Sequence, residues 1–175
     1  MANISGYCVP YVGAIIERVN ADGQKEFLIQ TRYKPDRPSI YNGTLEFAAG
    51  VLDKEYENVY EAIAREVKEE TGLKVTKIID DSRTVVFSPQ KVDKAFGFRP
   101  FCCTQQLKEG RPWVGFVFRC EVDSSEEPTD QLGETKNVHW MSADEFHGIF
   151  TNYPDQIFTL ELPAWEYYFK EFPLA

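Results

Sequence analysis

The pattern of apolar and polar residues predicts strands at the start of the chain. Residues 9–19 and 26–32 are rich in β-branched and aromatic residues, and the Asn-Ala-Asp-Gly sequence between them is a turn signal. These two segments are predicted to form a β-hairpin. A loop with two prolines follows at 34–43, and then a short strand over 44–50, which we expect to end in a turn at Ala48–Gly50.

A helix is predicted from Asn58 to Thr71. Asn58 can cap its first turn, with Glu61 as the reciprocal partner, and Gly72 is a natural stop. Apolar residues recur at every fourth position and form one stripe on the helix. They are Val59, Ile63 and Val67.

Strands and two further helices are predicted in the rest of the chain. Ser142, with Glu145 three positions later, caps a short helix, and a final helix spans 164–169. The predicted strands are 73–79, 84–87, 96–104, 113–122 and 137–141, and the aromatic residues Trp113, Phe116 and Phe118 are expected in the core. This order predicts an α/β fold, a mixed sheet between helical layers, in one domain over 1–175 with a helical segment at about 142–175.

Composition and charge limit the classes of ligand and partner that are expected for this protein. The chain has 175 residues and a formal net charge of -9, which argues against binding to long nucleic acids. Acidity still allows a small phosphate ligand, because a bound divalent cation reverses the local field. Four cysteines without a CxxC pair favour reduced thiols, with a disulfide or thiol chemistry as the alternative. No signal peptide or membrane-spanning stretch is visible, so we expect a cytoplasmic protein.

Three carboxylates are predicted to crowd one face of the helix. In REVKEETGL (65–73), Glu69 and Glu70 follow Glu66 by three and four positions. Like charges at this spacing cost roughly 0.2–0.5 kcal/mol per pair, which a hard cation such as Mg²⁺ would offset. Arg65 lies one turn from Glu61 and Glu69, so it could orient a ligating carboxylate. The alternative interpretation is an ordinary charged, exposed helix.

The segment 65–73 resembles the second half of the Nudix box at every fixed position, and Glu57 lies eight positions before Arg65, as that box requires. The opening glycine of the box would fall at Val51, whereas this chain has Gly50. We interpret this as a one-residue insertion in the loop 51–56.

The preceding segment, LEFAAG, is similar to the one that leads into the box in Nudix proteins, with Ala48 in place of a common proline. The resemblance implies that the carbonyl of Ala49 joins Glu66, Glu69 and Glu70 as a metal ligand. It also implies a Nudix-type α/β/α sandwich and Mg²⁺ as the cofactor, with Mn²⁺ as the alternative.

The resemblance implies hydrolysis of a diphosphate linked to another moiety, and this reaction needs a base to activate water. Many family members take the base from a loop before a late strand, where this chain has Glu134. Its alternative interpretation is a solvated loop acid. Glu126, Glu127 or a box glutamate such as Glu69 are the other candidates for the base.

Four residues are candidates for contact with the substrate. Arg32 and Lys34 lie where family members often place a cation for the phosphates, although either could be an ordinary surface charge. Pro89 follows Leu73 by sixteen positions, a spacing similar to that in the ADP-ribose pyrophosphatase branch, although loop prolines are common. Arg99 belongs to 88–101, which mixes cations with aromatic residues.

The expected function is therefore hydrolysis of a nucleoside diphosphate linked to another group, with ADP-ribose or a nucleotide sugar as the substrate class. The first alternative is a nucleoside triphosphate pyrophosphatase, and the second is a non-catalytic Nudix-fold nucleotide sensor. The aromatic run at 165–169 is expected to pack on the sheet, with a homodimer contact as its alternative.

Overall fold

The computed structural model describes residues 8–36, 39–80, 85–87, 94–123, 125–131, 133 and 135–174, with the backbone alone at 85–87. Eight strands of this described part form one mixed sheet, in which only the β1–β9 pairing is parallel. They are β1 (Val9–Val19), β2 (Lys25–Arg32), β3 (Leu45–Glu46), β4 (Ala48–Val51), β5 (Val75–Ile78), β8 (Cys102–Gln105), β9 (Trp113–Val122) and β10 (Thr135–Ser142).

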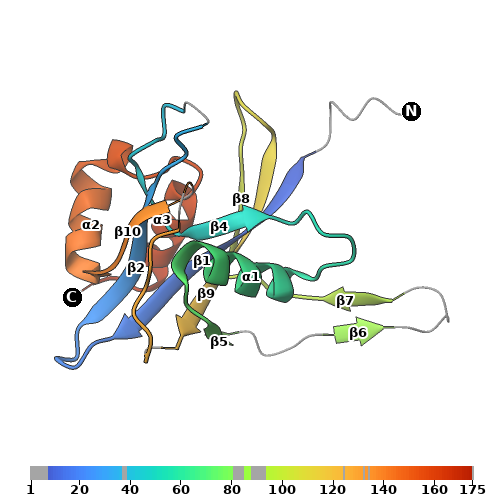
Figure 1. Cartoon of the computed structure of the whole chain (residues 1–175), viewed down its shortest axis with the longest axis horizontal. Helices are drawn as coiled ribbons and strands as arrows, with labels where there is room; N and C mark the ends of the chain where they lie inside the picture. Colours follow the sequence, from blue (N-terminus) through green and yellow to red (C-terminus); the bar gives the residue numbers. More distant parts are fainter. Residues whose placement is uncertain are drawn as a thin grey trace.

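The central path of the sheet runs β10-β2-β1-β9-β5, with β3 beside β2, β4 beside β1 and β8 beside β9. A separate two-stranded sheet, β6 (Val85–Phe87) and β7 (Ala95–Gly97), extends away from the main sheet below α1 (Figure 1). The helices are α1 (Val59–Thr71), α2 (Ala143–Asn152), η1 (Pro154–Gln156) and α3 (Leu162–Glu171).

The predicted β1–β2 hairpin is confirmed, but the two strands pair only near their turn, at 17–19 with 25–27. Farther from the turn, β1 pairs with β4 and β2 pairs with β3, so residues 45–51 fill the opening between them. The predicted turn at Ala48–Gly50 is wrong, because these residues belong to β4. The chain changes partner strand at Phe47, whose ring is buried and whose backbone N–H donates to the Glu161 carboxylate at 2.8 Å.

The single strand predicted over 96–104 is also wrong. The structure has β7 pairing with β6, and β8 pairing with β9, with residues 98–101 outside both strands. Pro100 lies in this interval and has no backbone N–H to donate to a strand partner. The segment therefore passes from one sheet to the other around the proline.

Helix α1 begins and ends as the sequence predicts. The Asn58 side chain accepts hydrogen bonds from the backbone N–H groups of Tyr60 and Glu61, and the Glu61 carboxylate accepts from the Asn58 N–H. Gly72 ends the helix at φ 75°, a left-handed conformation that suits glycine. The box segment is thus fixed by local capping at both ends.

Alternating residues of the sheet pack against helices on opposite faces, which gives an α/β/α sandwich (Figure 1). On β1, Val12, Ala14 and Ile16 share a core cluster with α1, whereas Ile15 belongs to the cluster with α2 and α3.

The last helix is longer than the predicted 164–169. Its rings Trp165, Tyr168 and Phe169 surround Phe27, so the aromatic run packs on the sheet as expected. The four cysteines are free thiols. Every helix in the described part of the chain is too short or too polar to traverse a bilayer.

Candidate functional site

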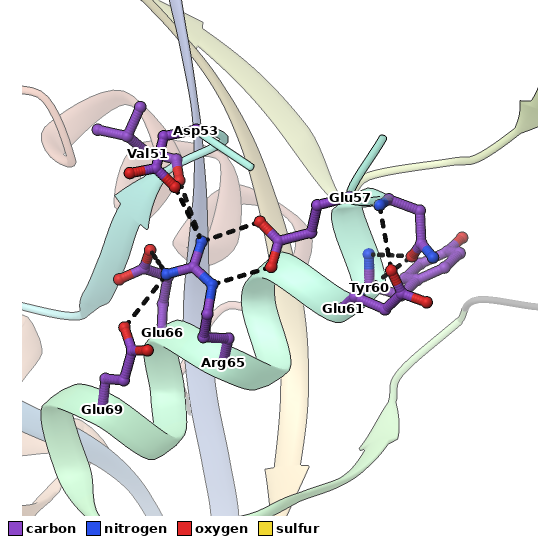
Figure 2. Close-up of polar contacts among 9 residues, drawn as sticks. Val51, Asp53, Glu57, Tyr60, Glu61, Arg65, Glu66 and Glu69 are labelled. Atoms are coloured by element: carbon purple, nitrogen blue, oxygen red, sulfur yellow. Dashed lines mark hydrogen bonds and ion pairs between the residues drawn. The ribbon is translucent and has the colours of Figure 1, made fainter. Parts of the chain in front are cut away.

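Arg65 is the centre of an ion-pair network on the box helix. Its Nε donates to Oε1 of Glu57 and its Nη2 donates to Oε2, both at 2.9 Å, so the ion pair is bidentate (Figure 2). This hydrogen bonding is the largest cause of the raised pKa of Arg65 and of the lowered pKa of Glu57. The Glu57 carboxylate and the Arg65 guanidinium therefore stay ionised and fix each other's position.

The guanidinium nitrogen that does not bond Glu57, Nη1, contacts two carboxylates of the box. Nη1 of Arg65 donates to one oxygen of Glu66 and, at 3.1 Å, to one oxygen of Glu69 (Figure 2). Nη2 also reaches the backbone carbonyl of Val51 at 3.3 Å. Arg65 thus connects the box helix to β4, while the Glu61 carboxylate caps the helix instead of pairing with Arg65.

The glycine before the box makes room for Glu66. A Cβ atom on Gly50 would lie 1.8 Å from the carboxyl carbon of Glu66 and 2.0 Å from one of its oxygens. Burial is the largest cause of the raised pKa of Glu66. This close approach agrees with the interpretation of Gly50 as the opening glycine, and the one-residue insertion later in the loop stays a prediction. Tyr56 lies there, 95% exposed, with φ 60°.

Glu70 points into the protein rather than toward Arg65. One of its oxygens accepts from Nε2 of Gln30 at 2.8 Å and from the backbone N–H of Ala49 at 2.9 Å. Burial, and then the nearby carboxylate of Glu46, raise the pKa of Glu70 to about 8. A buried carboxyl group in this state would be stabilised as an anion by a cation.

The predicted metal ligands fit a hard cation in their chemistry, since each offers carboxylate or carbonyl oxygen. Glu66 lies over Gly50, in space that any Cβ would fill, and Arg65 uses only one oxygen of Glu66 and of Glu69. In the described residues, however, no three acidic, His or Cys side chains converge closely enough to hold a metal ion. Joint ligation by Glu66, Glu69 and Glu70 therefore stays a prediction.

A pocket opens beside β4, and it contains two of the predicted substrate residues. Its lining comprises Tyr11, Arg32, Lys34, Glu46, Ala49, Gly50, Val51, Trp113, Phe158, Leu160 and Glu161. Nη1 of Arg32 pairs with Glu46 at 2.9 Å, and its guanidinium lies 4.6 Å from the Phe158 ring centre. The buried Nε of Arg32 has no hydrogen-bond partner among the described residues.

Arg99 lies elsewhere. It lines another pocket with Asp80, Arg119 and Glu171, and this lining shares no residue with that of Arg32 and Lys34. The structure therefore does not bring Arg99 together with the other predicted substrate residues.

Glu134 and Pro89 lie outside the described residues, so their predicted roles stay predictions. Thr135, the next residue after Glu134, donates its hydroxyl to the backbone carbonyl of Glu70 at 3.0 Å. The start of β10 therefore contacts the end of the box helix. Of the rival bases, Glu126 lies 3.8 Å from the Lys68 ammonium.

A sequence model of the family described as NUDIX domain matches residues 10–160. The chain belongs to the Nudix family. The matched region contains every described residue of the site except Glu161. No curated protein matches the chain at a significant level.

Solved structures support the fold at low sequence identity. A NUDIX hydrolase from Nitrosomonas europaea is 19% identical, with a TM-score of 0.59, over 94% of this chain and 90% of that one. A MutT protein from Methanosarcina mazei Go1 is 18% identical, with a TM-score of 0.63, over 95% and 96% of the two chains. The NUDIX domain of Shewanella oneidensis NrtR, solved with ADP ribose, is 13% identical, with a TM-score of 0.62, over 98% and 92%.

This Nudix pocket is also lined by residues that were not predicted there from the sequence, among them Trp113, Glu46 and Glu161. Trp113, expected in the core, is half-buried and lines the pocket. Glu46 and Glu161 are buried acids, 4% and 1% exposed, and burial is the largest cause of the raised pKa of both. Glu46 had one visible signal, since it is an acid inside an apolar strand. Glu161 had none, because it reaches the pocket only through the tertiary fold.

Proposed function

We propose that this Nudix protein is a Mg²⁺-dependent pyrophosphohydrolase that cleaves a nucleoside diphosphate linked to another group, with ADP-ribose or a nucleotide sugar as its substrate class. Mn²⁺ is the alternative cation. The observation that carries the proposal is the Glu66 carboxylate, seated over Gly50 and bonded by Arg65 beside a pocket that contains Arg32. A carboxylate for a hard cation thus lies against Gly50, which lines the same pocket as a cation for phosphate, Arg32.

Each residue would have a separate task. A divalent cation held by the Ala49 carbonyl, Glu66, Glu69 and Glu70 would neutralise the diphosphate and acidify the attacking water. Arg65 keeps Glu66 and Glu69 in position, because it is itself anchored to Glu57.

Arg32 would bind a phosphate oxygen through its unpaired Nε. Lys34, on the same pocket wall, adds positive charge there. These two cations would set the orientation of the diphosphate, so their main effect would be on substrate affinity.

The proton of the attacking water needs an acceptor, and we assign this role to Glu134. The support is its position in the chain, directly before Thr135, which is hydrogen-bonded to the box helix. A base contributes through kcat, since it acts on water after the substrate and cation have bound.

Two structural neighbours support a nucleotide joined to a second group. The NrtR domain was solved with ADP ribose, and another neighbour is an Ap4A hydrolase from C. elegans, 18% identical with a TM-score of 0.53, over 94% of this chain and 99% of that one. Both named compounds contain phosphoanhydride bonds between two larger groups. This common chemistry favours the nucleotide-sugar class over simple triphosphates.

A substrate panel tests the proposal. The protein is assayed with Mg²⁺ against ADP-ribose, nucleotide sugars, dinucleoside polyphosphates and nucleoside triphosphates, and the products are separated by chromatography. We expect ADP-ribose or a nucleotide sugar to give the highest kcat/KM and to yield a nucleoside monophosphate. Preferred release of inorganic pyrophosphate from a triphosphate would instead support the triphosphate pyrophosphatase. Binding of a nucleotide without turnover of any compound would support the sensor.

A further inference from the structure

A buried carboxyl group outside the box lines the pocket, and one of its oxygens has no hydrogen-bond partner among the described residues. Glu161 is 1% exposed, and its Oε2 accepts a hydrogen bond from the backbone N–H of Phe47 at 2.8 Å. Its Oε1 is buried and has no hydrogen-bond partner among the described residues. A buried polar atom without a partner is destabilising, which is reason to look for its partner in a ligand.

The surroundings of Glu161 decide whether Oε1 donates or accepts. Burial, and then the charge of Glu46, raise the pKa of Glu161 well above its ordinary value. The nearby cation, Arg32, makes its ion pair with Glu46 instead. Because Oε2 is already the acceptor for the Phe47 N–H, a proton on this carboxyl group belongs on Oε1. Oε1 then carries an O–H donor that has no partner among the described residues, on a residue that lines the pocket.

The pocket walls indicate which part of a substrate Oε1 meets. The cations Arg32 and Lys34 suit the phosphates, whereas the aromatic rings of Tyr11 and Trp113 line the same pocket with Glu161. The two rings meet edge to face, with centroids 6.2 Å apart. A nucleobase binds favourably by stacking on an aromatic side chain. Aromatic walls with a neutral donor fit a flat group that carries acceptor atoms, which describes a nucleobase.

We propose that Glu161 is a specificity-determining residue, whose Oε1 donates a hydrogen bond to an acceptor atom of the substrate's nucleobase. This inference rests on the proposed function, since it assigns the pocket to the nucleoside half of the substrate. Oε1 of Glu161 donates to the base, while Oε2 accepts from the Phe47 N–H and keeps the backbone in place directly before β4.

Two variants test the roles of the two Glu161 oxygens. Glu161→Gln keeps the shape, with an amide oxygen for the Phe47 N–H and an NH₂ donor in place of the Oε1 hydroxyl. Glu161→Met has a similar length and lacks both groups. The substrates are ADP-glucose, GDP-glucose, UDP-glucose and CDP-glucose, which share one sugar and differ only in the base.

The expected result is a change in base preference. In the wild-type protein, one base is preferred. Glu161→Gln keeps the kcat/KM ratios of the four substrates within about threefold, whereas Glu161→Met reduces the ratio of best to worst by about tenfold, mainly through KM, which corresponds to about 1.4 kcal/mol. A merely structural role would slow all four substrates by a common factor and leave the ratios unchanged. That outcome, or a wild type without base preference, overturns the proposal.

A second comparison, of ADP-ribose with ADP-glucose, changes the sugar of the substrate and keeps the base. If Glu161→Met changes this ratio and leaves the base ratios intact, the pocket holds the sugar and the proposal is wrong. Glu17→Gln is the matched control, because Glu17 is also a buried carboxylate but pairs with Arg119, away from the pocket. It is expected to lower the melting temperature and to leave the substrate ratios unchanged.

Binding of AMP, GMP, UMP and CMP, measured by calorimetry, separates this inference from the proposed function. These ligands carry the base and need no turnover, so the measurement applies even if no substrate in the panel is hydrolysed. Loss of base discrimination in Glu161→Met supports the inference. Unchanged discrimination, or failure of all four to bind the wild type, overturns it.

Discussion

Gly50→Ala is expected to remove most activity while the protein stays folded. The new Cβ would lie 1.8 Å from the Glu66 carboxyl carbon, whereas ordinary contact begins at 3.4 Å, so the carboxyl group must retreat by about 1.6 Å. A misplacement of about 1 Å in a catalytic constellation can cost about 10²-fold in rate. We therefore expect kcat to fall by about 10²-fold or more.

The stability of this variant should change little, because the colliding atoms are the end of a flexible side chain. Gly50 also has no left-handed backbone conformation that alanine would strain. Arg65 keeps its hydrogen bonds to Glu57 and Glu69 when Glu66 moves, so its guanidinium is not left without a partner. The melting temperature should therefore stay close to that of the wild type.

The assay measures kcat and KM for the best substrate of the panel across a Mg²⁺ titration, together with thermal melting. Gly148→Ala is the matched control, because a Cβ there meets no atom within 4 Å and the residue lies inside α2. That variant should keep full activity and gain about 0.5–1 kcal/mol of stability. A Gly50→Ala protein with kcat within threefold of the wild type at saturating Mg²⁺ would refute the role given to Glu66.

Three further changes test other parts of the site. Arg65→Lys keeps the charge but loses the two-pronged pairing with Glu57, so kcat should fall while an assay of folding shows little change; undiminished kcat would contradict the positioning role. In metal-free protein, stability should fall as pH rises from about 4.5 to about 8, because the unfolded chain loses the Glu70 proton before the folded one does; melting of Glu70→Gln should show a flatter pH dependence, and an unchanged slope would count against it. Glu134→Gln should lower kcat by roughly 10²–10⁴-fold and leave Mg²⁺ affinity unchanged; full kcat would move the base to another residue.

The elements predicted correctly from sequence are those whose signals are local. Asn58, Glu61 and Gly72 define the ends of α1 within a few residues of the backbone groups that they cap. The break at Phe47 has no local signal, because its hydrogen-bond partner, Glu161, is 114 residues away in the chain. The structure has β3 and β4 where one strand was predicted over 44–50, because β3 pairs with β2 whereas β4 pairs with β1.

The same distinction holds for the site. Arg65 and the box acids are neighbours on one helix, so their spacing alone brings Arg65, Glu66 and Glu69 together. Glu70 lies on the same helix but turns inward to Gln30, which helical spacing cannot reveal. The pocket walls come from strand ends far apart in sequence, so Trp113 could not be distinguished from a core aromatic residue before the fold was known.

Metal dependence is the central claim, and the most direct measurement is turnover of ADP-ribose by the wild type and by Glu69→Gln across a Mg²⁺ titration that starts from chelated protein. The account predicts no turnover without the cation, recovery on adding Mg²⁺, and a rate in Glu69→Gln that stays far below the wild type at saturation. Near-normal turnover by chelated wild-type protein, or by Glu69→Gln at low Mg²⁺, would contradict it.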